Sequence, residues 1–470
     1  MREVRVETTP QDDQLRFVTG AQVATTVPMT ATTAGLSFVG NAGIMGLGQV
    51  IYLACQWGAV ITLARLGGPE MVGRFALALA IAAPVMLFSN LGLRAALATD
   101  VRGEHPLGRY LALRCLTTAI GGAVVVGLAL GLGLEREVAV LVMAVALAKS
   151  AENLSDILYG VAQRHERFDL IARSMGARGA LGLLGMAAGI WLTGQVVYGA
   201  LGLALAWALV LAVHDWPATA PWRRTSAGAG APGAWLGLAW SALPLGVAAL
   251  LISLNGNLPR YVIADRFGAA ELGVFAAMAH LVVAGSMLIN VLGQVAIPRL
   301  ARAAAGHDRR GYLDLMGRML LAALLLGLLG LIAASLLHRE VMAFLYGDGF
   351  TAQSSLLIWV MLAGSMTHLA SCLGFGLTAL RLFRLAPPIY GLACLANLAM
   401  CWALVPILGL LGVVLAWAGA ATACALLNLL ANVWGASQPS IVSLQVSDDR
   451  GPMAPWTANP QARRLWWARS

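Results

Sequence analysis

The chain has 470 residues, of which 59% are hydrophobic and 11% are charged, with a formal net charge of +9 and a mean hydropathy of +0.77. Soluble globular domains carry about 25% charged residues, so this composition excludes a soluble protein and indicates a polytopic membrane protein. The six cysteines lie in apolar segments without paired spacing, so they predict neither a disulfide nor a metal site.

The apolar segments predict twelve membrane-spanning helices. A helix needs roughly 20 apolar residues to cross a hydrocarbon layer about 30 Å thick, and these segments lack the period of two that a barrel strand would need. The expected fold is all-α, with crossings at residues 43–64, 73–93, 110–132, 138–160, 174–194, 196–214, 235–264, 272–298, 312–337, 354–380, 387–408 and 410–434.

The arginines orient these crossings. Thirty of the 31 Lys and Arg residues are arginine, and with the N-terminus placed in the cytoplasm 24 of them fall in cytoplasmic segments. The six on the other side are Arg65, Arg74, Arg136, Arg260, Arg266 and Arg339. Because cytoplasmic loops carry the Lys/Arg excess, we expect both termini in the cytoplasm. The positive net charge then reflects topology and contact with anionic lipids, and we expect no nucleic-acid partner.

An internal repeat predicts two lobes. Five residues between positions 68 and 90 recur 200 positions later: Gly68, Gly73, Phe75, Ala76 and Asn90 match Gly268, Gly273, Phe275, Ala276 and Asn290. Six crossings separate the copies, and an even number keeps their orientation, so we expect two parallel six-helix lobes. The expected organisation is a flexible cytoplasmic N-terminal arm (1–40), an N-lobe (41–214), a cytoplasmic linker (215–234), a C-lobe (235–435) and a cytoplasmic C-terminal tail (436–470).

Charged side chains inside one crossing mark a candidate site. Lys149, Glu152 and Asp156 fall within about 60° of one another on a helix and therefore share a face. A charge at mid-helix costs about 2.5 to 3.5 kcal/mol on insertion scales, so the cluster either faces a wet cavity or pairs internally. The functional interpretation is a substrate or ion site between the lobes. The structural interpretation is a Lys149–Glu152 pair that neutralises itself, which leaves Asp156 uncompensated unless Arg178 reaches it.

A second polar cluster lies in the crossing at 235–264. Pro259 lacks an N–H and clashes with the carbonyl of Asn255, so we expect a bend there and a freed carbonyl, with a second bend at Pro244. Both prolines are candidate gate or hinge positions. Asn255, Asn257 and Arg260 are candidates for an anion-binding wall of the substrate cavity, since guanidinium matches phosphate bidentately. Alternatively, Arg260 extends to the outer headgroups.

The first crossing adds polar amides. Gln49 and Gln56 share a face with Tyr52, at positions i, i+7 and i+3. They either line the same cavity or form hydrogen bonds between helices.

Three stretches resemble polysaccharide flippases, the Wzx-like transporters of the multidrug/oligosaccharidyl-lipid/polysaccharide exporter superfamily. They are residues 63–75 (LARLGGPEMVGRF), 149–167 (KSAENLSDILYGVAQRHER) and 257–261 (NLPRY), and the likeness covers roughly residues 35–435. The resemblance implies a two-lobed, twelve-helix transporter that moves undecaprenyl-diphosphate-linked oligosaccharide across the bacterial inner membrane by alternating access, for surface or exopolysaccharide assembly.

The resemblance also implies roles for individual residues. Lys149, Arg178 and Arg260 would bind the diphosphate or acidic sugars, while Glu152 and Asp156 would bind protons or cations, or restrain Lys149. This chain departs from a strongly cationic cavity, because the helix at 138–160 supplies two acids for one base. The implied partners are the lipid-linked oligosaccharide, membrane lipids, the polysaccharide polymerase and the chain-length machinery. No catalytic residue, cofactor or metal is implied.

Other functions stay open at this point. A lipid II flippase or a drug/cation antiporter of the same superfamily is the nearest alternative, although lipid II flippases usually have fourteen helices and antiporters typically place an acidic residue in the first crossing. A membrane-embedded glycosyltransferase or polymerase is the alternative from a different class. Such an enzyme usually carries its catalytic residues on a long outer loop, whereas no gap between the predicted crossings exceeds about 20 residues.

Overall fold

The computed structural model describes residues 38–100, 105–225 and 234–437, and every regular element within them is a helix. The predicted N-terminal arm up to residue 37 and the predicted tail beyond residue 437 lie outside the described residues. The elements are α1 (Phe38–Ser89), α2 (Leu93–Thr99), α3 (Leu107–Gly131), α4 (Arg136–Arg164), α5 (Phe168–Thr193), α6 (Val196–Val210), a π-helical turn η2 (Leu211–Asp215), α7 (Trp216–Ala218), α8 (Ala220–Thr225), α9 (Ala234–Arg266), α10 (Ala269–Ala305), α11 (Arg309–Tyr346), η3 (Asp348–Phe350), α12 (Leu356–Ala379), η4 (Phe383–Leu385), α13 (Ala386–Leu408) and α14 (Leu410–Ala436).

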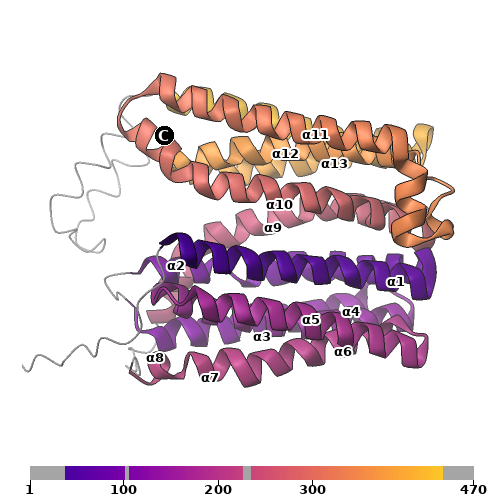
Figure 1. The fold of residues 1–470 in the computed structure, drawn as a ribbon, viewed down its shortest axis with the longest axis horizontal. Helices are drawn as coiled ribbons and strands as arrows, with labels where there is room; N and C mark the ends of the chain where they lie inside the picture. Colours follow the sequence, from indigo (N-terminus) through magenta and orange to yellow (C-terminus); the bar gives the residue numbers. More distant parts are fainter. Residues whose placement is uncertain (1–37, 101–104, 226–233, 438–470) are drawn as a thin grey trace, which may run out of the picture.

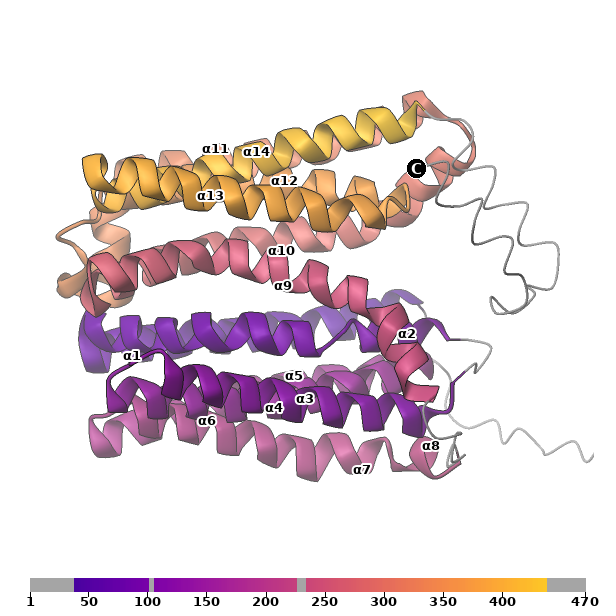
Figure 2. The same ribbon diagram turned by 180° about the vertical axis from the view of Figure 1, so that it is seen from behind.

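The long helices form two lobes. Helices α1 to α6 pack against one another in the N-lobe, and α9 to α14 pack against one another in the C-lobe (Figure 1). The view from behind shows the same two layers, indigo to magenta and pink to yellow (Figure 2). The lobes meet mainly where α1 contacts α9, α10 and α11. The predicted all-α, two-lobed architecture is confirmed.

Helix α1 contains two crossings. Its 52 residues would span about 78 Å at 1.5 Å per residue, far more than one hydrocarbon layer. The helical geometry breaks at Gly68, whose φ of 68° and ψ of −171° are rarely available to residues with a side chain, and Pro69 follows it. Eleven helical stretches are long and apolar enough to span a membrane, and the break in the first of them gives twelve crossings in the described residues.

The two ends of the bundle differ in their connections. At one end the six hairpin connections each contain a glycine with positive φ, namely Gly68, Gly133, Gly194, Gly268, Gly347 and Gly409. We call this the glycine end. The opposite end holds the connections between α4 and α5, α10 and α11, and α12 and α13, and α14 also ends there (Figure 1). Because the predicted cytoplasmic arginines lie in and beside these connections, we call it the basic end.

The segment predicted as a linker between the lobes is partly helical. Residues 216–225 of the predicted linker form the short helices α7 and α8, while 226–233 lie outside the described residues. The first turns of α9 pack on the N-lobe, where Leu238 and Ala242 join an apolar cluster with Leu91, Leu97 and Leu113. The C-lobe therefore begins with a segment that crosses over the N-lobe at the basic end, and α9 bends as it does so (Figure 2).

The outer surface of the bundle is apolar. Trp402, Phe344 and Leu205 are 83%, 80% and 72% exposed. Aqueous exposure of such side chains over a whole helix surface is unfavourable, whereas hydrocarbon accepts them. The protein is a multi-pass membrane protein.

Candidate substrate cavity between the lobes

The two copies of the repeated glycine meet at the glycine end. A Cβ placed on Gly73 of α1 would lie 1.7 Å from the carbonyl oxygen of Ala269, and a Cβ placed on Gly273 of α10 would lie 1.7 Å from the carbonyl oxygen of Pro69. Positions 69 and 269 are also 200 residues apart, so the contact is symmetric between the repeats. The lobes therefore touch backbone to backbone here, as two parallel repeats about a common axis would.

Polar contacts between the two lobes reinforce this backbone contact. The Arg65 guanidinium of α1 donates to carbonyls of the last turn of α11, including Ala343 at 3.2 Å. A cation there satisfies the free carbonyls and complements the negative end of the helix dipole. The Trp57 indole donates to the Tyr346 hydroxyl at 3.1 Å. Both contacts join the N-lobe to the end of α11.

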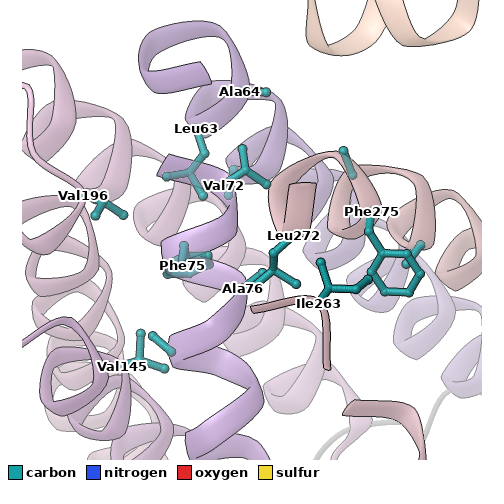
Figure 3. Packing of buried hydrophobic residues seen from close by; sticks show 14 of the residues in the cluster. Leu63, Ala64, Val72, Phe75, Ala76, Val145, Val196, Ile263, Leu272 and Phe275 are labelled. Carbon is teal, nitrogen blue, oxygen red and sulfur yellow. The ribbon is translucent and has the colours of Figure 1, made fainter. Parts of the chain in front are cut away.

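Apolar packing closes the same region. Ala76 of α1 lies beside Leu272 of α10 and Ile263 of α9 (Figure 3), and these residues belong to one buried cluster that extends into both lobes. Helices α1 and α10 come together toward the glycine end in Figure 1. We call the contacts of Gly73, Gly273, Arg65 and Trp57 the glycine-end seam.

A cavity of about 290 Å³ lies behind the seam, between α1, α4, α5 and α6 of the N-lobe and α9 and α10 of the C-lobe. Most of its lining is apolar, from residues such as Val60, Leu79 and Met186. Its polar lining combines five predicted substrate residues, Gln56, Lys149, Arg178, Asn257 and Arg260, with Trp207 and His280.

In the N-lobe wall of the cavity, the carboxylate of Glu152 pairs with two cationic side chains. The Lys149 Nζ lies 2.7 Å from Oε2 of Glu152, and Nη2 of Arg178 lies 3.4 Å from Oε1. Arg178 is 3% exposed, so its charge depends on these neighbours. Lys149 thus pairs with Glu152 and lines the cavity at once, and the wall retains one positive charge in excess.

Two aromatic side chains complete this wall. The Trp207 ring lies 4.6 Å from the Arg178 guanidinium and 5.7 Å from the Lys149 ammonium, within the range of cation–π attraction. The Tyr52 hydroxyl donates to Glu152 at 3.2 Å and accepts from Gln56 at 3.0 Å. Sequence reasoning missed Trp207, because a single tryptophan in an apolar segment is usual in membrane helices.

The C-lobe wall is formed by Arg260 and its neighbours. The Arg260 guanidinium donates to Oδ1 of Asn257 at 2.8 Å and to the Gly256 carbonyl at 3.0 Å, both on its own helix. Its side chain lines the cavity. His280 of α10 lies on the same cavity. The cavity residues therefore carry three cationic side chains beside one carboxylate, that of Glu152.

Two predicted residues do not line the cavity. Asn255 faces α13, where the Asn397 amide donates to its side-chain oxygen at 3.2 Å and to its backbone carbonyl at 3.4 Å. That carbonyl is the one that Pro259 frees, so Asn397 supplies its replacement partner. Gln49 lies two turns before Gln56 on α1 and is not among the lining residues. The hinge role of Pro244 and Pro259, both inside the continuous α9, stays a prediction.

Asp156 is compensated, but by two other arginines and not by Arg178. Asp156 lies 3.2 Å from Arg94 and 3.1 Å from the fully buried Arg114, through its two oxygens. The reason is the position of each residue along the bundle. Helix α4 runs toward the basic end and α5 runs back, so Arg178 lies at the same level as Glu152. Asp156 lies one turn further along, where α2 and α3 supply arginines. The two acids thus belong to separate ion-pair clusters.

Replacing Asp156 with alanine is expected to destabilise the N-lobe by about 3–5 kcal/mol, because it leaves the buried Arg114 charge without its partner. Thermal unfolding of the purified protein, followed by size-exclusion chromatography, measures this. The matched control is Asp314→Ala, which removes an exposed pair with Arg318 at 2.8 Å and should cost less than about 1 kcal/mol. Equal melting temperatures for the two variants would contradict a structural role for Asp156.

In the part of the chain that the structure describes, no three His, Cys, Asp or Glu side chains come together as metal ligands. The side chains that line the cavity supply ammonium, guanidinium, amide and imidazole groups, which bind and orient charged or polar ligands.

Comparison with solved structures finds the same fold in membrane transporters. The chain is 14% identical to a multidrug resistance MATE family transporter of the MOP superfamily in an inward-facing conformation, with a TM-score of 0.65 over 87% of this chain and 99% of that one. It is 12% identical to the lipid II flippase MurJ in an inward closed conformation, with a TM-score of 0.67 over 82% of this chain and 87% of that one. These likenesses establish that the chain shares the fold of these two proteins.

Sequence comparison gives the family. The capsular polysaccharide biosynthesis protein CapF of Staphylococcus aureus is 24% identical over 343 residues, which are 68% of this chain and 80% of that protein. The profile of the polysaccharide biosynthesis protein family matches residues 38–304, more than half of the chain. The resemblance to polysaccharide flippases is thereby confirmed, and the chain belongs to the polysaccharide biosynthesis protein family.

Proposed function

We propose that this protein is a flippase that translocates undecaprenyl-diphosphate-linked oligosaccharide repeat units across the bacterial inner membrane, for surface or exopolysaccharide assembly. The observation that carries the proposal is the cavity at the lobe interface, where Lys149 and Arg178 face Arg260 from the other lobe. A diphosphate presents several anionic oxygens to such a set, and guanidinium groups bind phosphate bidentately. The apolar remainder of the lining reduces screening by water and strengthens these contacts.

The position of Glu152 supports an exchange mechanism. Its two oxygens hold Lys149 and Arg178 in this conformation. An incoming diphosphate competes with Glu152 for the same two cations, and a proton or cation bound at Glu152 would release them. Glu152 is thus a candidate coupling site that acts by restraining Lys149.

The seam and the basic end support alternating access. The glycine-end seam closes one side of the cavity, so exchange with the membrane or solvent in this conformation must come from the other side. The excess of arginines at the basic end favours a cytoplasmic location for that end and for both termini. Substrate then enters from the cytoplasm, and rocking of the lobes opens the glycine end to deliver it, where we expect the polymerase and chain-length machinery to receive it.

Deletion of the gene in its bacterial host tests this function. The expected result is loss of surface polysaccharide together with accumulation of completed lipid-linked repeat units on the cytoplasmic leaflet. Absence of completed units would indicate a glycosyltransferase, and single repeat units delivered to the cell surface would indicate a polymerase. Normal surface polysaccharide in the deletion strain would contradict a required role in export.

A further inference from the structure

A second pair of arginines shares one carboxylate on the basic side of the cavity. Nη1 of Arg94 in α2 lies 3.2 Å from Oδ1 of Asp156, and Nη2 of Arg114 in α3 lies 3.1 Å from Oδ2. This cluster carries two positive charges against one negative charge. The cavity wall has the same composition, with two cations on Glu152. An excess positive charge therefore occurs at two successive levels of the N-lobe.

The two levels lie on one face of α4. Asp156 follows Glu152 by four residues, which is about 6 Å along the helix axis toward the basic end. Gln163 lies seven residues beyond Asp156 on the same face. The side chains of Glu152, Asp156 and Gln163 are all partly exposed. A line of accessible polar groups thus extends from the cavity to the basic end of α4.

Tyr159 connects the cations of the two levels. The Arg94 guanidinium lies over the Tyr159 ring, 5.5 Å from its centroid and within the range of cation–π attraction. The Tyr159 hydroxyl accepts a hydrogen bond from Nη1 of Arg178 at 3.2 Å. Nε of Arg94 also donates to the Gln163 side-chain oxygen at 3.3 Å. Arg94 is therefore separated from the cavity cation Arg178 by a single aromatic side chain.

Helix α2, which carries Arg94, lies at the boundary between the lobes. Leu97 of α2 belongs to one apolar cluster with Leu238 and Ala242 of α9. A Cβ placed on Gly92, just before α2, would lie 3.2 Å from the Cβ of Leu245. Figure 2 shows α2 beside the first turns of α9 at the basic end. An anion that moves from the basic end to the cavity along α4 therefore meets Arg94 first.

The two arginines of this cluster have different surroundings. The Arg114 side chain is fully buried, donates to Asn90, and has an Nε with no hydrogen-bond partner among the described residues. Since a buried charge without a counter-charge is costly, Arg114 holds Asp156 in place. The Arg94 side chain is 29% exposed. Asp156 keeps a counter-charge if Arg94 turns away from it, so Arg94 is free to exchange Asp156 for an incoming anion.

We propose that Arg94, held beside Asp156 and Arg114, is an entry site that binds the diphosphate of the substrate before it reaches the cavity. Guanidinium groups bind phosphate oxygens bidentately, and a partly exposed guanidinium can make these bonds without a large rearrangement. The phosphate of an anionic lipid headgroup offers the same chemistry, so the test must distinguish the two sources. The inference rests on the proposed function, because it takes the cavity to be the next diphosphate site.

Calorimetry with farnesyl diphosphate tests the entry site in nanodiscs of phosphatidylcholine. The double variant Lys149→Ala/Arg260→Ala removes two cavity cations, and we expect it to retain a weak diphosphate site. Adding Arg94→Ala to this variant should weaken the remaining binding at least about tenfold, and Arg94→Lys should restore most of it. The matched control is Arg173→Ala, which removes an exposed arginine 4.0 Å from Asp169 at the same end. It should leave the remaining affinity within about twofold.

Thiol labelling locates the bound probe. The substitution Gln163→Cys, in a chain whose six cysteines are replaced, places a thiol beside Arg94. Farnesyl diphosphate should slow the reaction of this thiol with a maleimide, and Arg94→Ala should abolish the protection. Nanodiscs that contain phosphatidylglycerol but no farnesyl diphosphate should give no protection. Protection by phosphatidylglycerol as strong as that by farnesyl diphosphate would assign the site to lipid headgroups and overturn the proposal.

Melting temperatures and the cavity variants separate the remaining outcomes. Arg94→Ala should melt close to wild type, because Asp156 keeps Arg114. A loss of melting temperature as large as that of Asp156→Ala would make Arg94 a structural residue and refute the entry site. Unchanged binding after Arg94→Ala in the double variant would also refute it. If the double variant binds as tightly as wild type while Arg94→Ala weakens binding, the cavity fails as the diphosphate site and the site at Arg94 stands.

Discussion

Alanine at Lys149 or at Arg260 is expected to weaken binding of an isoprenyl diphosphate by about 10- to 150-fold in each case, since hydrogen bonds to charged groups contribute about 1.5–3 kcal/mol. Export of surface polysaccharide should fall accordingly, while membrane insertion stays intact. The two residues come from opposite lobes and line one cavity, so each loss removes one side of the anion site. Calorimetry on purified variants and complementation of the deletion strain measure the two effects.

The matched control for these variants is Arg302→Ala. Arg302 lies near the basic end of α10, is exposed, and its Nε donates to the backbone carbonyl oxygen of Pro298 on the same helix at 3.3 Å. The Arg302→Ala substitution removes a positive charge outside the cavity. It should therefore leave diphosphate affinity and export within about twofold of wild type, as surface substitutions usually do. Normal surface polysaccharide in both Lys149→Ala and Arg260→Ala would show that the cavity does not carry the substrate.

Alanine at Gly73 or Gly273 is expected to open the glycine-end seam. The added Cβ would lie 1.7 Å from a carbonyl oxygen of the facing lobe, and the obstacle is backbone, so the helices themselves must separate. The lobes can still fold, because each glycine contacts the other lobe. We expect the equilibrium to shift away from the closed conformation and export to fall strongly, since transport needs both conformations.

Cysteine labelling measures this opening. Cys55 lines the cavity, so a chain in which the other five cysteines are replaced reports access from the outer face of intact cells to a membrane-impermeant maleimide. Labelling should increase in Gly73→Ala and Gly273→Ala. The control is Gly127→Ala on α3, where an added Cβ meets no atom within 4 Å. Labelling that is equal in all three variants would refute the seam as the closing contact.

Much of the fold was accessible from sequence because a bilayer imposes strong rules. Apolar length gave the crossings, and the repeat around Gly68 and Gly268 gave two parallel lobes. The contact of Gly73 with Gly273 was not predicted, since two equivalent positions in a repeat can lie anywhere about the axis. Only the packing of α1 against α10 brings their backbones together.

The candidate site was also only partly predictable from the sequence. Lys149, Arg178 and Arg260 could be found because a charge within an apolar helix is costly and needs a reason. Trp207, an uncharged side chain in an apolar helix, carried no such signal. The partners of Asp156 were missed because Arg94 and Arg114 fit the positive-inside rule, which assigns arginines near helix ends to topology and hides their role in pairing.

The most direct test of the account is translocation by the purified protein. The protein is reconstituted into vesicles that contain a fluorescent undecaprenyl-diphosphate-linked saccharide, and a membrane-impermeant reductant quenches the label that reaches the outer leaflet. With wild-type protein and with Arg302→Ala, quenching should proceed to completion. With Arg260→Ala, it should stop at the fraction initially in the outer leaflet. Complete quenching by Arg260→Ala, or none beyond that initial fraction by wild type, would contradict a flippase that works through this cavity.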